Sequence, residues 1–311
     1  MELVRGLHNL RPEHRGCVAT IGSFDGIHLG HQAVLARLAA QGRERHLPVT
    51  LVTFEPQPRE YFMPEAAPPR LTRFREKLEV LRHCGIDRVV CLRFNDYLAG
   101  LTADEFIQRI MLDGLVVKYL VVGDDFRFGK GRTGDYSLLE QAGKMHGFPV
   151  VTMQTFNVGN HRVSSTRIRE ALNAGDLSGA EALLGRPYWM SGRVAHGDKR
   201  GRTIGFPTAN IFLHRNAVPV DGVFAVDMSG IDNRPVTGVA NVGTRPTVDG
   251  SRTLLEVHLF DFDRDIYGCH VQVSFLKKLR PERRFESFEL LKRQIELDAE
   301  QARVFFAGTA A

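Results

Sequence analysis

Apolar runs alternate with helix-type patterns through the first half of the chain. Five runs have the length and composition of buried strands: 17–21, 49–54, 88–92, 119–122 and 149–152. Helical periodicity fills the intervals between them: 30–41, 73–83, 103–111 and 136–146. Strands that alternate with helices of about 10–15 residues are typical of βαβ units. The pattern therefore predicts a parallel sheet with helices, which binds its ligands at the carboxyl ends of the strands.

Two of the predicted helices begin with residues typical of capping boxes. Thr102 is followed three residues later by Glu105, and Ser137 is followed in the same way by Glu140. In a capping box, each side chain accepts a hydrogen bond from the other residue's backbone N–H. The pattern therefore predicts Thr102 and Ser137 at the starts of these helices.

The second half shows a different pattern, because short apolar runs now follow one another directly. They are separated by turn-prone residues and lie at 190–195, 223–227, 236–241, 254–260 and 271–275. Such a succession predicts an antiparallel barrel or sandwich. A last helix at 288–305 would cap it with these apolar residues: Leu290, Leu291, Ile295, Leu297 and Ala299. We expect two domains, at 1–184 and 185–311.

Composition narrows the class of protein. The 311 residues include 41 Lys and Arg against 36 Asp and Glu, which gives a formal charge of +5, and 43% of the residues are hydrophobic. Long disorder and fibrous repeats are excluded by these values. A basic balance can indicate nucleic-acid binding, but the basic residues are mixed with acidic ones. Phosphate-bearing small substrates explain the same excess, so we expect no nucleic-acid partner.

The cysteines and the apolar runs bear on location. The four cysteines form no CxxC pair, which is typical of free thiols in a reducing compartment. The first residues lack the apolar run of about 7–15 residues that a signal peptide needs. No internal run approaches the ~20 apolar residues of a membrane-spanning helix. We expect a cytoplasmic protein with no membrane partner.

The segment from Gly22 to His31, GSFDGIHLGH, follows the first predicted strand and opens the first predicted helix. A glycine-containing turn at this junction lets backbone amides approach a phosphate, and the helix N-terminus favours negative charge. His28 and His31 are three residues apart, so both imidazoles can face the same point. There they would stabilise charge that develops on a phosphoryl group. The alternative is an ordinary helix start with two solvated histidines.

Two further segments carry candidate phosphate or substrate contacts. RVSSTRIR, at 162–169, has three hydroxyls and three guanidinium groups just before another helix, and it would clamp the β- and γ-phosphates. Hydroxyls also cap helices in ordinary proteins. VGDDFRFGKGR, at 122–132, ends a predicted strand, and Asp125 could hold a substrate by hydrogen bonding. Its alternative is a structured turn.

In the second half, glycines alternate with basic residues at 196–205, and this loop would cover phosphates as a mobile flap. Thr208 and Asn210 are two residues apart, so in an extended segment they point to the same face. Their neutral oxygens suit Mg²⁺, which usually takes few protein ligands besides substrate phosphates. The alternative is a basic hairpin loop.

Glu256 interrupts an otherwise apolar strand pattern, LEVHLF. A carboxylate there is costly to bury unless it is paired or used, which makes Glu256 a candidate general base. A structural glutamate that is hydrogen-bonded across the barrel remains the alternative. His258, on the same face, fits packing better than catalysis.

The HxGH pattern in a parallel α/β domain resembles the nucleotidyltransferase superfamily, whose members transfer a nucleotidyl group and release pyrophosphate. The combination of motifs resembles a narrower family, the bacterial bifunctional riboflavin kinase/FAD synthetases. The segments that carry this resemblance span almost the whole chain: GSFDGIHLGH, TFEPQP, VGDDFRFG, VSSTRIR, GRTIGFPTAN, VANVGTRPTVDG, LEVHLFDFDRDIYG and FLKKLRPERRF. The resemblance implies a Rossmann-like FMN adenylyltransferase domain followed by a β-barrel riboflavin kinase domain with a C-terminal helix.

The resemblance also implies two reactions and assigns residues to them. Riboflavin would be phosphorylated by ATP with Mg²⁺ to give FMN, with Glu256 as the base and Thr208 and Asn210 holding the ion. FMN would then be adenylylated by ATP to give FAD and pyrophosphate. His28, His31 and Arg169 would act as the catalytic residues of that step. The remaining residues expected to bind nucleotide or flavin are Gly22, Ser23, Phe24, Asp25, Gly30, Asp125, Arg162, Ser164, Ser165, Thr166, Arg167, Gly197, Lys199, Gly201, Thr203 and Gly205.

The resemblance implies riboflavin, FMN and ATP as partners, and apo-flavoproteins as acceptors of FAD. One position departs from the family pattern, because FEPHP is replaced here by FEPQP. Gln57 keeps hydrogen-bonding ability but cannot carry a positive charge, which puts a charged role at that position in doubt. Two alternatives stay open: another adenylyl- or cytidylyltransferase, and a flavin-binding regulator without turnover.

Overall fold

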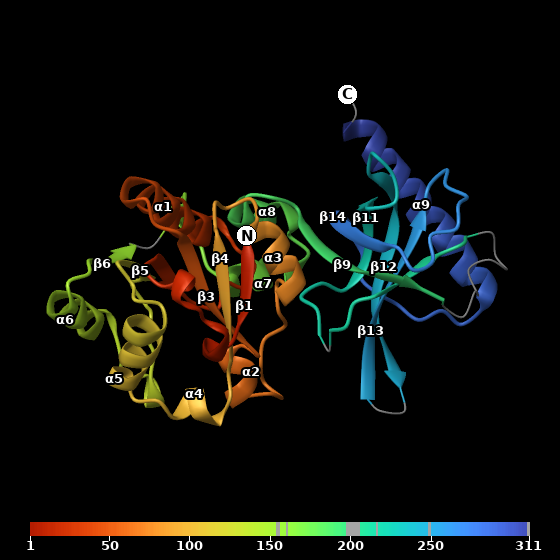
Figure 1. Ribbon diagram of the computed structural model, residues 1–311. Helices are drawn as coiled ribbons and strands as arrows, with labels where there is room; N and C mark the ends of the chain where they lie inside the picture. The colour runs from red at the N-terminus through yellow and green to blue at the C-terminus, as the bar shows by residue number, and fades with distance from the viewer. Residues whose placement is uncertain (154–155, 160, 197–205, 216, 248–249, 310–311) are drawn as a thin grey trace. The chain divides into compact units, whose positions relative to one another are not determined.

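The chain forms two compact units in a computed structural model that describes residues 1–153, 156–159, 161–196, 206–215, 217–247 and 250–309. The first unit comprises Met1–Pro68 and Thr72–Ser164, and the second comprises Pro69–Leu71 and Ser165–Ala311. Each unit has its own sheet, as Figure 1 shows. The domain boundary expected at 184–185 stays a prediction. Among the described residues, no helix is long and apolar enough to span a membrane.

The first unit is built on a six-stranded parallel sheet, in the order β1-β4-β3-β2-β5-β6. Five strands confirm the predicted runs: β2 (Val18–Ile21), β3 (Val49–Glu55), β4 (Arg88–Arg93), β5 (Tyr119–Gly123) and β6 (Val150–Met153). The edge strand β1 (Glu2–Arg5) was not predicted. It has four residues of mixed polarity and is held by pairing with β4.

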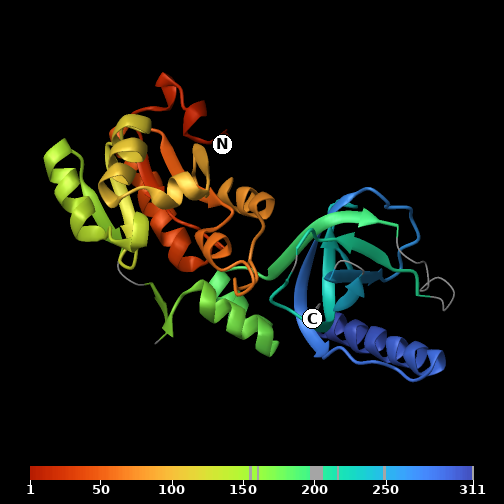
Figure 2. The same cartoon turned by 90° about the horizontal axis from the view of Figure 1, so that it is seen from below.

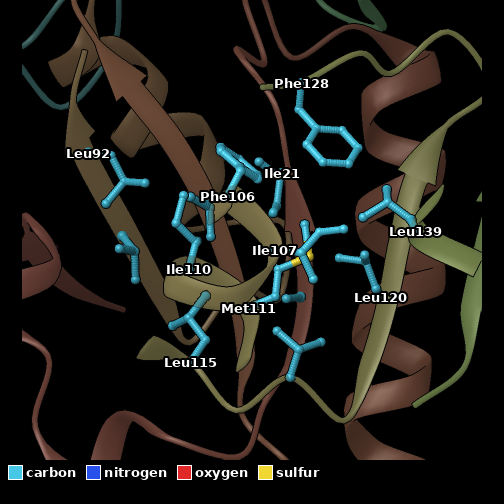
Figure 3. Packing of buried hydrophobic residues seen from close by; sticks show 14 of the residues in the cluster. Ile21, Leu92, Phe106, Ile107, Ile110, Met111, Leu115, Leu120, Phe128 and Leu139 are labelled. Atoms are coloured by element: carbon cyan, nitrogen blue, oxygen red, sulfur yellow. The ribbon is translucent and has the colours of Figure 1, made fainter. Parts of the chain in front are cut away.

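Both faces of this sheet are buried, which explains why its strands are nearly continuous apolar runs. One face packs against α5 (Ala103–Phe106) and the π-helix η3 (Ile107–Gly114). Figure 3 shows Ile110 and Met111 among the strand residues of that face. The other face packs against α1 (Leu29–Arg45) and α3 (Phe74–Leu81). The turned view in Figure 2 shows helices on both sides of the strands.

One predicted capping box is confirmed and the other is wrong. The Glu105 N–H donates to Thr102 Oγ1 (3.2 Å), and the Thr102 N–H donates to Glu105 Oε2 (2.9 Å). The helix α6 (Tyr136–His146) is capped instead by Asp135, whose carboxylate accepts from the Leu138 N–H at 3.1 Å. Ser137 therefore lies inside α6, because the aspartate two residues earlier is an equally good cap.

The remaining elements of the first unit are short. They are η1 (Leu7–Asn9), η2 (Pro12–His14), α2 (Pro58–Phe62), α4 (Asp96–Gly100), η4 (Lys130–Arg132), and the hairpin of β7 (Asn157–Val158) and β8 (His161–Arg162). Helices α7 (Ser165–Ala174) and α8 (Leu177–Leu184) open the second unit.

The second unit contains a closed antiparallel barrel, in the order β10-β13-β12-β11-β14-β9. Its strands are β9 (Tyr188–Ala195), β10 (Ala209–Phe212), β11 (Gly222–Ser229), β12 (Val236–Thr247), β13 (Gly250–Leu259) and β14 (His270–Arg280). This confirms the predicted barrel. The four-residue strand β10 was not predicted as a strand, because it is too short to show an alternation of its own.

The C-terminal helix α9 (Phe288–Thr309) packs on the outside of the barrel, as Figure 1 shows. The apolar stripe predicted for its contact is wrong in part, because Leu290 and Leu297 are 50% and 44% exposed. The helix docks instead through Ala299 and Ala302, whose small side chains permit close approach. Asp298 adds a two-point ion pair with Arg280, at 2.9 Å to Nε and 2.7 Å to Nη2.

We expect Ile110→Ala to destabilise the first unit by about 2–5 kcal/mol, because truncation leaves a cavity in the face of the sheet that η3 covers. Hydrogen exchange measures this locally: amides of β3 and β5 lose protection, while those of β11 and β12 do not. The exposed neighbour Gln108→Ala serves as the control. Equal effects of the two substitutions would contradict this account of the core.

Candidate active sites

The turn between β2 and α1 carries the first candidate site. It follows the carboxyl end of β2, the strand from which the sheet extends through β3 on one side and β5 on the other. Open parallel sheets bind ligands at such a switch point, where successive connections leave in opposite directions. Gly22, Ser23, Phe24 and Asp25 therefore lie where the sequence predicted a nucleotide contact.

The backbone of this turn is held in an uncommon conformation. Phe24 and Ile27 have φ of 47° and 42°, a left-handed region that non-glycine residues rarely adopt. Two hydrogen bonds with Thr72 hold this conformation. The Thr72 N–H donates to Asp25 Oδ1 (3.0 Å), and the Gly26 N–H donates to Thr72 Oγ1 (3.0 Å). Asp25 is buried, and here it shapes the turn.

His28 and His31 form one stacked pair. Their ring centroids are 3.7 Å apart with an interplanar angle of 14°. His28 is the N-cap of α1, and its Nδ1 accepts from the His31 N–H at 3.3 Å. Because Nδ1 accepts this bond, the proton of a neutral His28 ring lies on Nε2. A Cβ on Gly30 would lie 3.2 Å from His28 Nδ1, so a glycine there gives the ring room.

His31 is held in its neutral form. Burial, the neighbouring His28 and the charge of Lys77 keep the pKa of His31 well below its usual 6.5. Its Nδ1 is buried and has no hydrogen-bond partner among the residues the structure describes. The site therefore offers two imidazoles on one helix start, an arrangement suited to donating hydrogen bonds to phosphate oxygens.

Two predicted binding residues of the first unit contact each other. Arg162 Nη2 lies 2.7 Å from Asp125 Oδ2 and 3.7 Å from Asp124 Oδ1, and all three side chains are largely exposed. An exposed ion pair of this kind contributes little to stability. The contact between Arg162 and Asp125 therefore costs little to break.

The segment that follows Arg162 is divided between the units. Ser164 ends the first unit, and Ser165, Thr166, Arg167 and Arg169 lie in α7 of the second. Arg169 Nε donates to the Pro69 carbonyl at 2.7 Å, which orients the guanidinium group. Proximity of these residues to the two histidines stays a prediction.

The barrel carries the second candidate site. Glu256 on β13 lies directly opposite Asn210 on β10 and opposite Asn241 on β12. Val239, two residues before Asn241, packs with the helix α9, so this face of β12 is the outer one. The three polar side chains are therefore neighbours on the outside of the barrel. Asn241 was not predicted, because a pairing between distant strands leaves no signal in local spacing.

His258 contacts the two residues that lie shortly before β10, Phe206 and Pro207. Its Nδ1 lies 2.9 Å from the Pro207 carbonyl oxygen, and its ring contacts Phe206 edge-on at 5.1 Å. Thr208 follows directly, and Asn210 is the second residue of β10. His258 is thus a packing residue, as its strand position indicated. The predicted loop residues Gly197, Lys199, Gly201, Thr203 and Gly205 lie outside the described residues.

The oxygens at this site fit a magnesium ion. Within the described ranges, no three His, Cys, Asp or Glu side chains are grouped as metal ligands. Mg²⁺ typically binds through few protein oxygens, waters and substrate phosphates. The Asn210 amide beside the Glu256 carboxylate offers donors of that kind, and Thr208 is two residues before Asn210.

Comparisons with known proteins decide the family. Residues 10–167 match the family model of FAD synthetase, and residues 184–306 match that of riboflavin kinase. A relative from Escherichia coli K12, a bifunctional riboflavin kinase/FMN adenylyltransferase, is 54% identical over 310 residues, which are 99% of both chains. The chain belongs to the bifunctional riboflavin kinase/FMN adenylyltransferase family.

Other members of this family match over their whole length. Relatives of the same description from Pseudomonas fluorescens and Haemophilus influenzae are 53% and 50% identical, over 100% and 98% of this chain and 99% of each relative. A crystal structure described as a macrolide-efflux protein from Streptococcus pneumoniae shares the fold. It has a TM-score of 0.82 and 32% identity, and the match covers 97% of this chain and 99% of that one.

We expect the His31 imidazole to titrate well below 6.5 in the folded chain, because burial disfavours its charged form. Its contribution to stability is complete above the unfolded pKa of 6.5, and it is lost as the pH falls from 6.5 towards the lowered folded pKa. Imidazole NMR against pH measures the folded pKa, with His31→Asn to assign the signal. Titration at or above 6.5 would contradict a buried, neutral His31.

Proposed function

We propose that the chain carries out two consecutive reactions with two separate sites. Riboflavin kinase activity on the barrel gives FMN, and FMN adenylyltransferase activity on the parallel-sheet unit gives FAD and pyrophosphate. The observation that carries the proposal is the match of each unit to its own family model, together with relatives that match over nearly the whole chain. The substrates are riboflavin, FMN and ATP.

In the kinase step, Glu256 takes the proton of the ribityl 5′-hydroxyl as its oxygen attacks the γ-phosphorus of ATP. The bond to the β-phosphate breaks and ADP leaves. Asn241 and Asn210 flank Glu256 in register and hold its carboxylate in place. Thr208 and Asn210 would hold a divalent ion with ATP, and we propose Mg²⁺, which neutralises phosphate charge.

In the adenylyl transfer, a phosphate oxygen of FMN attacks the α-phosphorus of ATP, and pyrophosphate leaves as that bond breaks. The His28 Nε2–H and the neutral His31 donate hydrogen bonds to the phosphate oxygens as charge builds on them. The amides of the turn after β2 and the N-terminus of α1 add positive partial charge.

The other predicted residues bind the substrates of this transfer. Ser164, Ser165, Thr166, Arg167 and Arg169 hold the β- and γ-phosphates, and Asp125 contacts the flavin. Arg162 exchanges Asp125 for phosphate when the nucleotide arrives. Release of FAD to apo-flavoproteins and a location in the cytoplasm complete the proposal.

Glu256→Gln tests the separation of the two sites. We expect FMN formation from riboflavin to fall by about 10²–10⁴-fold, the usual contribution of a general base. Conversion of supplied FMN to FAD stays near the unaltered rate, because the two histidines of that step lie in the other unit. Chromatography measures both, and Glu300→Gln, an exposed position of α9, is the control. Equal loss of both activities in the folded variant would contradict the assignment of Glu256 to the kinase step alone.

His28→Ala tests the other site in the same way. We expect FAD formation to fall by about 10²–10³-fold, the usual cost of removing one donor to a charged transition state. FMN then accumulates from riboflavin at the unaltered rate. The matched control is His146→Ala at the exposed end of α6. Undiminished FAD output would remove His28 from the mechanism.

A further inference from the structure

The helix α3 carries a lysine inside the first unit. The side chain of Lys77 is 0% exposed, whereas lysines are almost never fully buried unless they are paired. Its Nζ donates to the Ser23 carbonyl at 2.6 Å. Removing an ammonium from water is costly even when it is hydrogen-bonded.

The position of Lys77 relates it to the turn after β2. Thr72, five residues earlier, holds the same turn through Asp25 and Gly26. Lys77 holds it through Ser23, on the side where the chain leaves the strand. The segment that leads into α3 and its first turns therefore fix the turn at Ser23, Asp25 and Gly26. Ser23 and Asp25 adjoin Phe24, which has a left-handed backbone.

The charge of Lys77 also acts on His31. Its ammonium is close enough to His31 to contribute to that residue's lowered pKa. A buried charge is screened by salt much less than an exposed one. It therefore adds positive charge near the turn at which an anionic phosphate would bind.

We propose that Lys77 is a positioning residue for the adenylyl transfer, which holds the turn through the Ser23 carbonyl and adds fixed positive charge beneath the phosphate subsite. This rests on the proposed function of the first unit. The group recognised is a polyphosphate, the triphosphate of the nucleotide substrate or the pyrophosphate that leaves. Because the charge is in place before the substrate binds, no reorganisation is needed during the reaction.

The test is Lys77→Met, which keeps the length of the side chain but removes its charge. We expect kcat/KM for ATP in the conversion of FMN to FAD to fall by about 10²-fold, the cost of a small misplacement of reacting groups. The Ki of adenosine as an inhibitor competitive with ATP stays unchanged, because adenosine has no phosphate. The exposed Lys118→Met is the control, and hydrogen-exchange protection of β3 and β5 reports that the first unit is intact.

The comparison of ATP with adenosine separates the effect of the Lys77 charge on phosphate binding from a change in the shape of the site. If Lys77 only supports the fold, the KM for ATP and the Ki of adenosine rise together, and the proposal is overturned. It is also overturned if kcat/KM for ATP stays unchanged. Should Lys77→Met fail to fold, Lys77→Gln gives the same comparison with a polar neutral side chain. Absence of FAD formation by the unaltered chain would refute the proposed function itself, a result distinct from either outcome.

Discussion

The turn from Gly22 to His28 is the constraint on which the first unit depends. The chain must leave a buried central strand and enter a helix within a few residues, and it does so with left-handed backbone at Phe24 and Ile27. Such a backbone persists only where its surroundings determine it. Thr72, Asp25 and the buried Lys77 supply those surroundings. The same turn places His28 at the N-cap of α1. The contacts that fix the backbone of the turn therefore also fix the position of this imidazole.

In the barrel, strand pairing positions the residues of the candidate site. Its polar residues come from three strands that are distant in sequence, and only the pairing register makes Asn210, Glu256 and Asn241 neighbours. A slip of one residue in β13 would turn Glu256 to the other face. The register is held by the closure of the barrel and by α9, which is fixed through Asp298 and Arg280. The stability of the barrel therefore maintains the geometry of its site.

Much of the fold could be predicted from the sequence, because periodicity reports burial directly. Parallel strands buried on both faces read as apolar runs, and the glycines and histidines at 22–31 mark a strand-to-helix turn. What was missed depends on distant partners. The edge strand β1 forms by pairing with β4, and Asn241 is a neighbour of Glu256 only because their strands pair in that register. Lys77 on α3 has the sequence context of an ordinary helical lysine, although it is buried. The prediction that Leu290 and Leu297 contact the barrel was wrong because both are largely exposed. The helix docks through Ala299 and Ala302, whose small side chains permit close approach, and hydropathy alone does not indicate this.

We infer that one chain runs two reactions in series at two sites. A time course of riboflavin with ATP and Mg²⁺, with the flavins separated by chromatography, follows both reactions at once. We expect FMN to appear first, pass through a maximum and decline as FAD accumulates. FMN alone, under conditions that support adenylylation, would contradict the assignment of the first unit. Riboflavin that binds and yields no product would contradict both.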